Sequence, residues 1–182
     1  MMKIIATNIG ERKKIIWKNK TITTGIYKYP TEKPIFLDIK DVDGDNVIDR
    51  KNHGGIEQAV YAYGFQHYTY WKNLYPNLDW NYGMFGENLT VDNLDETHIF
   101  VGDVFRVGDA IIEVTKSRQP CYKLGVRFNN MKIVKQFWNT NMCGVYFKII
   151  QTGKVHVNDL FELLKTNSKN PTIADVYNEK KG

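Results

Sequence analysis

The chain has 182 residues, of which 42% are hydrophobic and 25% are charged, which excludes a disordered chain and predicts one globular domain. Its net charge of +5 is modest, and we expect the basic residues to be spread out, which does not favour nucleic acid as a partner. Two cysteines are too few for a disulfide framework, and no apolar run is long enough to cross a membrane. We therefore expect a cytoplasmic protein without a membrane partner.

Short apolar runs separated by turn residues dominate the chain and predict β-strands. In chain order, strands are expected over residues 3–8, 14–17, 21–29, 35–39 and 59–63, in several pieces within 87–115, and over 145–151 and 155–164. A tight turn is expected at residues 43–45, and strand breaks at 102–103 and 108–109. Apolar residues at helical spacing predict helices over 65–74 and 129–140.

Many short strands with few helices predict a mainly β fold, in the form of a closed or nearly closed β-barrel. We assign this domain to residues 1–165. Residues 166–182 are polar and are expected to form a short C-terminal tail, with one or two helical turns at 172–177.

A first candidate cluster is the segment DRKNHGG at residues 49–55. Paired glycines such as Gly54 and Gly55 let a backbone approach a ligand and direct N–H groups at an anion. Lys51 offers a positive charge to a phosphate, and His53 offers a group that titrates near neutral pH. On this segment alone, an ordinary polar loop is the favoured interpretation.

A second cluster is the segment GMFGENLT at residues 83–90. Its glycines are expected to shape a loop, and Glu87 and Asn88 supply polar groups where that loop enters a strand. No Gly-Lys-Ser/Thr follows, so the segment is not a nucleotide P-loop.

A third cluster surrounds Cys121 in the segment SRQPCYKL at residues 117–124. A lone cysteine is most often a buried apolar residue. However, Cys121 lies between Arg118 and Lys123, at the expected start of a helix, and such surroundings stabilise a thiolate. A thiolate is both a nucleophile and a soft metal ligand. Cys143 has no such cationic neighbours and is interpreted as structural.

Taken together and in this order, the clusters resemble the MOSC family, named for the C-terminal domain of molybdenum cofactor sulfurases, and in particular its stand-alone bacterial, YiiM-like branch. The matching stretches are Gly44-Asp45, DRKNHGGIEQAVYAY at 49–63, GMFGENLTV at 83–91, VGDVFRVGDAIIEVT at 101–115 and SRQPCYKLGVRF at 117–128. The resemblance implies a β-barrel whose cleft binds the molybdenum–molybdopterin cofactor (Moco). Longer members continue into a small helical domain, of which the polar tail would be a remnant.

The resemblance also implies roles for individual residues. Cys121 would ligate molybdenum, and His53 would transfer protons. The remaining cofactor-binding residues would be Lys51, Gly54, Gly55, Glu87, Asn88, Arg118 and Lys123.

The function expected is that of an oxidoreductase that reduces N-hydroxylated bases or related small molecules. The chain has no flavin or iron–sulfur signature, so an external reductase must donate the electrons. Two alternatives stay open: a non-catalytic cofactor or sulfur carrier that uses a persulfide on Cys121, and a nucleic-acid-binding barrel. The physiological substrate and the oligomeric state, a homodimer included, are also left open.

Overall fold

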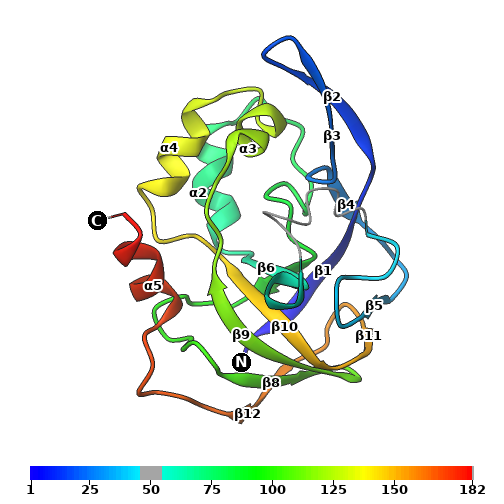
Figure 1. Cartoon of the computed structure of the whole chain (residues 1–182), viewed down its shortest axis with the longest axis vertical. Helices are drawn as coiled ribbons and strands as arrows, with labels where there is room; N and C mark the ends of the chain where they lie inside the picture. The colour runs from blue at the N-terminus through cyan, green and yellow to red at the C-terminus, as the bar shows by residue number, and fades with distance from the viewer. Residues whose placement is uncertain (46–54, 182) are drawn as a thin grey trace.

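A computed structural model describes residues 1–45 and 55–181 of the chain. Figure 1 shows strands that form a curled sheet, with the helices of residues 67–74, 122–127 and 132–138 gathered at one end and the C-terminal helix apart from them along one side. The strands are β1 (Lys3–Gly10), β2 (Lys13–Trp17), β3 (Lys20–Thr24), β4 (Lys28–Pro30), β5 (Ile35–Leu37), β6 (Val60–Gly64), β7 (Leu89–Asp92), β8 (Val104–Val107), β9 (Ala110–Ser117), β10 (Val145–Gln151), β11 (Gly153–Val155) and β12 (Phe161–Lys165). The helices are the 3-10 turn η1 (Ile56–Gln58), α2 (His67–Leu74), α3 (Tyr122–Arg127), α4 (Lys132–Trp138) and α5 (Ile173–Glu179).

The main sheet has eight strands in the order β12-β8-β9-β10-β6-β7-β1-β4. Its neighbours are antiparallel except for β6 and β7, which are parallel. The mainly β class is confirmed, and the predicted closed or nearly closed barrel is supported only in part: among the described residues, no β-ladder joins the two edge strands β12 and β4. The sheet does curl back on itself, because Lys3 of β1 forms a single antiparallel bridge with Leu160, just before β12. One bridge is too short to close the ladder, so the sheet remains open.

Two predicted strands are each divided in the structure. The run expected over residues 21–29 becomes β3 and β4, which belong to different sheets. The run expected over 155–164 becomes β11 and β12, separated by a turn in which Asn158 has a positive φ of 76°. The side chain of Asp159 holds this turn by accepting a hydrogen bond of 2.7 Å from the backbone N–H of His156. The breaks fall at Gly25 and at Asn158-Asp159, which are residue types that favour turns.

The helices close one end of the sheet over a layer of buried aromatic rings. Trp71 of α2 and Phe137 of α4 stack with their ring centroids 5.9 Å apart. Phe85 lies 4.3 Å from the ring of Tyr63, and the Tyr63 hydroxyl accepts a 2.8 Å hydrogen bond from the Trp71 indole. All four of these side chains are fully buried. Such aromatic layers bury a large apolar area per residue, so they hold α2 and α4 firmly against the sheet.

The C-terminal segment packs against the domain. The predicted helical turns are present as α5, which begins at a capping box formed by Thr172 and Asp175. Ile173 and Tyr177 are fully buried, and the Tyr177 hydroxyl donates a 3.1 Å hydrogen bond to the backbone carbonyl of Phe137. The segment is polar on average, but its few apolar residues recur at helical spacing and form one buried face.

The strands β2 and β3 form a separate two-stranded arm, which extends away from the main sheet (Figure 1). Its turn consists of Lys18 and Asn19, both with positive φ, as tight hairpins require. Five exposed cations lie on or beside the arm: Arg12, Lys13, Lys14, Lys18 and Lys20. With Glu11, they give residues 11–20 a net charge of +4, so the arm is a local concentration of positive charge in a chain whose other basic residues are spread out.

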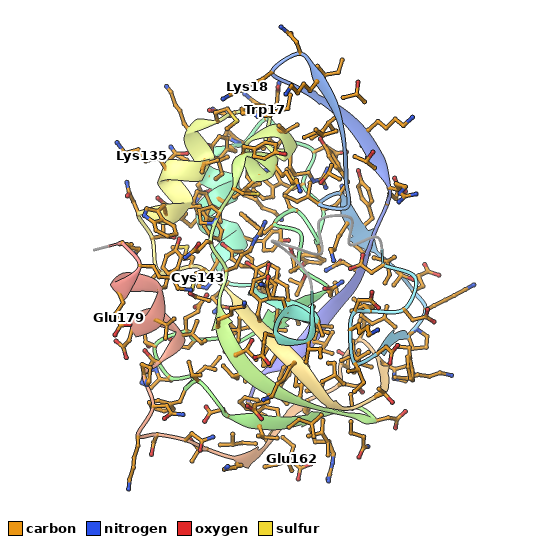
Figure 2. All side chains as sticks on the ribbon, in the orientation of Figure 1. Trp17, Lys18, Lys135, Cys143, Glu162 and Glu179 are labelled. Atoms are coloured by element: carbon orange, nitrogen blue, oxygen red, sulfur yellow. The ribbon has the colours of Figure 1, made fainter. Side chains whose placement is uncertain are left out.

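The arm is fastened to the domain near its tip. Figure 2 marks Trp17 and Lys18 at this end of the molecule, far from Glu162 of β12. The Trp17 ring stacks on Tyr122 of α3 with a centroid distance of 5.0 Å and an interplanar angle of 21°. Ile15 of β2 is buried and belongs to the hydrophobic core. Two strands alone are marginally stable, so these contacts fix the arm in place.

Within residues 1–45 and 55–181, no helix is both long enough and apolar enough to span a bilayer.

Candidate functional site

The site is centred on the connection between β9 and α3. The chain leaves β9 at Ser117, and Cys121 then stands in extended conformation as the residue that precedes α3. The Cys121 backbone carbonyl accepts a 3.0 Å hydrogen bond from the N–H of Leu124, which closes the first helical turn. The Cys121 thiol is free and half-buried. The predicted change from strand to helix at Cys121 is therefore confirmed.

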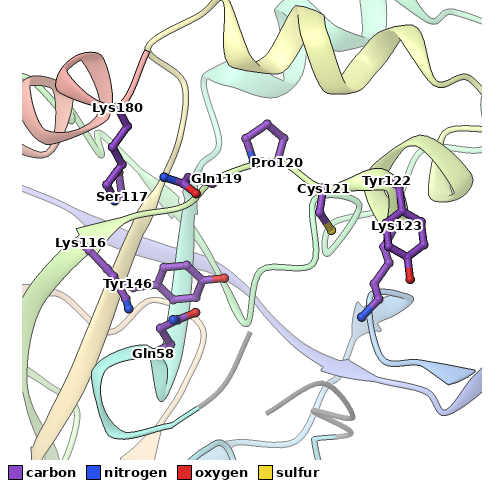
Figure 3. Close-up of a pocket in the computed structure, with 10 residues that line it drawn as sticks. All are labelled: Gln58, Lys116, Ser117, Gln119, Pro120, Cys121, Tyr122, Lys123, Tyr146 and Lys180. Carbon is purple, nitrogen blue, oxygen red and sulfur yellow. The ribbon is translucent and has the colours of Figure 1, made fainter. Parts of the chain in front are cut away.

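A cavity of about 370 Å³ opens beside Cys121 (Figure 3). This volume lies within the range typical of small-molecule sites. The lining contains three lysines and, among the described residues, no aspartate or glutamate. It is formed by Gln58, Lys116, Ser117, Gln119, Pro120, Cys121, Tyr122, Lys123, Tyr146 and Lys180. The wall therefore offers one thiol in a field of positive charge.

Arg118 lies buried behind this wall, with an exposure of 5%. Its guanidinium donates a hydrogen bond to the backbone carbonyl of Phe85 and lies 4.9 Å from the centre of the Tyr61 ring. Burial acts to lower the pKa of Arg118, but Tyr61, Tyr146 and Cys121 together outweigh it, and the pKa is raised. Arg118 is therefore a permanent positive charge near the thiol.

The loop that precedes β7 is shaped by two glycines, as the sequence predicts. Gly83 and Gly86 have positive φ values of 83° and 79°. A Cβ atom on Gly83 would lie 2.6 Å from the backbone carbonyl oxygen of Lys28, so only glycine fits there.

Glu87 holds this loop from within and is fully buried. Its carboxylate accepts hydrogen bonds from the N–H of Gly83 at 2.9 Å, the N–H of Phe85 at 3.1 Å, the Thr90 hydroxyl at 2.9 Å and the Tyr68 hydroxyl. Burial raises the pKa of Glu87, although these hydrogen bonds oppose the shift. The peptide groups of Phe85 are thus held from both sides, the N–H by Glu87 and the carbonyl by Arg118.

Asn88 is also buried and connects three segments of the chain. Its side-chain amide donates a 2.8 Å hydrogen bond to Asp45, and its side-chain oxygen accepts one of 3.4 Å from the N–H of Tyr61. Asp45 in turn forms an ion pair with Lys28 and accepts a 2.7 Å hydrogen bond from the N–H of Gly10. The predicted turn at residues 43–45 is present, with Gly44 at a φ of 77°.

The structure brings some of the predicted site residues together and not others. Cys121 and Lys123 share the cavity wall. Arg118, Glu87 and Asn88 are buried and do not line the described cavity, and their roles as cofactor ligands stay predictions. Gly55 is exposed, with a φ of 100°, and precedes η1. Lys51, His53 and Gly54 lie outside the described residues.

Four lining residues lie outside the three candidate clusters of the sequence: Gln58, Lys116, Tyr146 and Lys180. Lys116 and Tyr146 lie opposite one another on β9 and β10. Strand pairing could have indicated this pair, but no local pattern connects Lys180 of the C-terminal segment with Cys121. Among the described residues, no three His, Cys, Asp or Glu side chains gather where they could hold a metal ion, so Cys121 is a single candidate ligand.

Comparison with known proteins assigns the chain to a family. A family model described as the MOSC domain matches residues 49–162, which is more than half of the chain. The chain belongs to the MOSC family. Its relatives and structural neighbours place it in the YiiM-like branch.

Three curated relatives share about one third of their residues with the chain. Protein YflK of Bacillus subtilis is 34% identical over 170 residues, which cover 93% of this chain and 76% of YflK. Protein YiiM of Escherichia coli is 34% identical over 143 residues, or 78% of this chain and 64% of YiiM. A protein named reductase from Gibberella moniliformis is 33% identical over 147 residues, or 79% of this chain and 26% of that protein. The chain thus spans under two thirds of YiiM and about a quarter of the fungal reductase.

Solved structures show the same fold. The crystal structure of YiiM from Geobacillus stearothermophilus matches with a TM-score of 0.79 and 27% identity, covering 100% of this chain and 87% of that one. YiiM from Escherichia coli matches with a TM-score of 0.75 and 27% identity, covering 97% of this chain and 76% of that one.

Proposed function

We propose that the protein binds the molybdenum–molybdopterin cofactor through Cys121 and reduces N-hydroxylated small molecules with electrons from an external reductase. The observation that carries this proposal is a free thiol on the wall of a lysine-lined cavity in a chain of the MOSC family. The relative named reductase supports the direction of the reaction.

The residues present fit the chemistry of the cofactor. A thiolate is a soft ligand suited to molybdenum, and Cys121 is accessible from the cavity. Cationic side chains suit a phosphate, and Lys123 lines the cavity two residues after Cys121 while Arg118 lies behind it. When bound, the cofactor supplies the two-electron redox chemistry.

The protein's own groups would bind, orient and supply protons. Reduction of an N-hydroxylated compound breaks the N–O bond and consumes two electrons and two protons, so an amine and a molecule of water form. The electrons come from the external reductase. Tyr146 lines the cavity, and burial raises the pKa of its hydroxyl. The hydroxyl therefore stays protonated at neutral pH and can donate a hydrogen bond to the substrate. His53 remains the proposed proton-transfer residue.

A sulfur or cofactor carrier is the alternative that the same thiol supports. A half-buried cysteine on a cavity wall could hold a persulfide as well as a metal. The two functions differ in metal retention: an oxidoreductase must keep molybdenum through turnover, whereas a sulfur carrier need not.

The test is the substitution Cys121→Ser in protein produced in a host that makes the cofactor. We expect the variant to fold, and to lose at least about 100-fold in kcat because the soft metal ligand is gone. The assay is reduction of benzamidoxime with a chemical electron donor, together with elemental analysis for molybdenum. Cys143→Ala is the matched control, since Cys143 does not line the cavity.

Three results are distinguishable. An active wild type and a folded, inactive Cys121→Ser variant support the oxidoreductase. An inactive wild type that carries a labile sulfur on Cys121 supports the carrier. A Cys121→Ser variant that keeps its molybdenum and its activity refutes the proposal.

A further inference from the structure

The cavity has a second cationic end, away from the thiol. Figure 3 shows Cys121 and Lys123 together on one side, while Lys116 and Lys180 approach the cavity from the other. Gln58 and Tyr146 lie at this second end and add polar groups to it. We call Lys116 and Lys180 the distal lysine pair.

The distal lysine pair is not neutralised by the residues that the structure describes. No ion pair to either lysine is found there, and no carboxylate lines the described cavity wall. By contrast, Lys148 on β10 is paired with Glu113 of β9 at 2.8 Å, outside the cavity. Among the residues that the structure describes, the distal end therefore has no carboxylate against its positive charge, and this charge suits an anionic ligand.

Lys180 reaches the cavity because α5 is docked firmly. Tyr177 anchors the helix in the core, and the ammonium of Lys181 donates to the Thr140 carbonyl at 2.8 Å, to Asn141 at 3.0 Å and to Asn178 at 2.9 Å. Two adjacent lysines thus have different roles: Lys181 fastens the end of the helix, and Lys180 lines the cavity.

We propose that the distal lysine pair binds an anionic group of the substrate, either a carboxylate or a phosphate. This rests on the proposed function and names its substrate class: N-hydroxylated molecules that carry a negative charge at the end remote from the N–OH group. The anion would lie at Lys116 and Lys180, which directs the N–OH group toward Cys121.

The cofactor's own phosphate is another source of the same charge, but the position of Lys180 favours the substrate. The MOSC domain match ends at residue 162, so α5 lies beyond the part of the chain that defines the family. Cofactor binding is expected from the shared part, where Lys123 and Arg118 already supply cations near the thiol. Lys180 lies outside the residues that match the MOSC domain, so its charge is suited to selecting among substrates.

The experiment compares two substrates that differ in one charge, benzamidoxime and 4-carboxybenzamidoxime, on cofactor-loaded protein with a chemical electron donor. For the wild type, we expect a KM about tenfold lower for the carboxylate than for the neutral compound, because two partly exposed charge contacts are each worth under about 1 kcal/mol. In the double variant Lys116→Ala/Lys180→Ala this preference should disappear. The double variant Lys116→Arg/Lys180→Arg should restore it.

Lys135→Ala is the matched control, because it removes the same charge from an exposed position on α4, outside the cavity lining. It should leave both the melting temperature and the preference for the carboxylate intact. Molybdenum content is measured for every variant.

Each outcome has one meaning. A wild type that reduces neither compound refutes the proposed function itself. A wild type that reduces both without preference, or a double variant that keeps the preference, overturns only the role of the distal lysine pair. Loss of molybdenum from the double variant assigns the lysines to the cofactor phosphate and overturns the substrate assignment.

Discussion

The two cysteines of this chain occupy opposite environments in one small domain. Cys121 is half-buried on the wall of a polar cavity. Cys143 is completely buried, and the Cys143 backbone carbonyl accepts a 2.8 Å hydrogen bond from the Tyr61 hydroxyl (its position is marked in Figure 2). Burial and the nearby Glu96 raise the pKa of the Cys143 thiol well above its usual value. The same side chain is thus an accessible ligand in one place and an inert packing group in the other.

This difference shows which features separate a functional cysteine from a structural one. Whether a cysteine is reactive depends on its exposure to a cavity and on the sign of the neighbouring charges, and not on the residue type alone. Cys121 has Arg118 and Lys123 nearby. At Cys143, burial and the carboxylate of Glu96 raise the pKa and outweigh Lys181 and Lys180, which lower it, so the prediction that Cys143 has no cationic neighbours was wrong. The comparison can be tested at several levels.

The largest expected effect is on alkylation. Cys121 should react with iodoacetamide at neutral pH at least about 100-fold faster than Cys143, because Cys143 reacts only when the fold opens. Mass spectrometry after brief labelling of cofactor-free protein measures both rates. Equal rates, or faster labelling of Cys143, would contradict the assignment of the site.

A smaller effect is expected on stability. Cys143→Ser places a hydroxyl in a fully buried apolar site and should lower the free energy of unfolding by about 1–3 kcal/mol. Cys121→Ser, on the cavity wall, should change it by less than about 1 kcal/mol. Urea denaturation of the two variants beside the wild type gives the values, and the reverse order would show that Cys121 is the structural residue.

The smallest effect concerns alkaline pH. Below the ordinary thiol pKa of 9.0, Cys143 is protonated in both the folded and the unfolded state. Above it, the unfolded thiol ionises while the buried one stays protonated, so the free energy of unfolding falls as pH rises. Cys143→Ala should make this decline shallower between pH 9 and 10, by up to about 1.4 kcal/mol per pH unit. Identical slopes in wild type and variant would mean that Cys143 ionises normally in the fold.

Much of the fold could be predicted because local patterns report directly on it. Short apolar runs between turn residues identified β1, β6, β9 and β10, and helical spacing identified α2 and α4. The paired glycines of the loop before β7 were also interpretable, because positive φ angles at Gly83 and Gly86 require that residue type.

The remainder depends on contacts between distant residues. Closure of the sheet rests on whether β12 meets β1 along a ladder or at a single bridge, and no local pattern encodes that. Lys180 joins the cavity only because Tyr177 docks α5 in the core. The sequence predicted Glu87 as a cofactor-binding residue. Its place inside the loop, where the N–H groups of Gly83 and Phe85 and the Thr90 hydroxyl donate hydrogen bonds to it, depends on the folded backbone.

The stacking of Trp17 on Tyr122 places a natural fluorophore beside a residue of the cavity wall. Tyr122 lines the cavity and directly follows Cys121, while Trp17 stands on the arm at a centroid distance of 5.0 Å. Trp71, by contrast, is completely buried in the aromatic layer behind α2. Indole emission depends on local polarity and on quenching by neighbouring groups, so a ligand that shifts Tyr122 changes the light that Trp17 emits. The arm therefore gives the cavity an optical reporter, with no label attached to the chain.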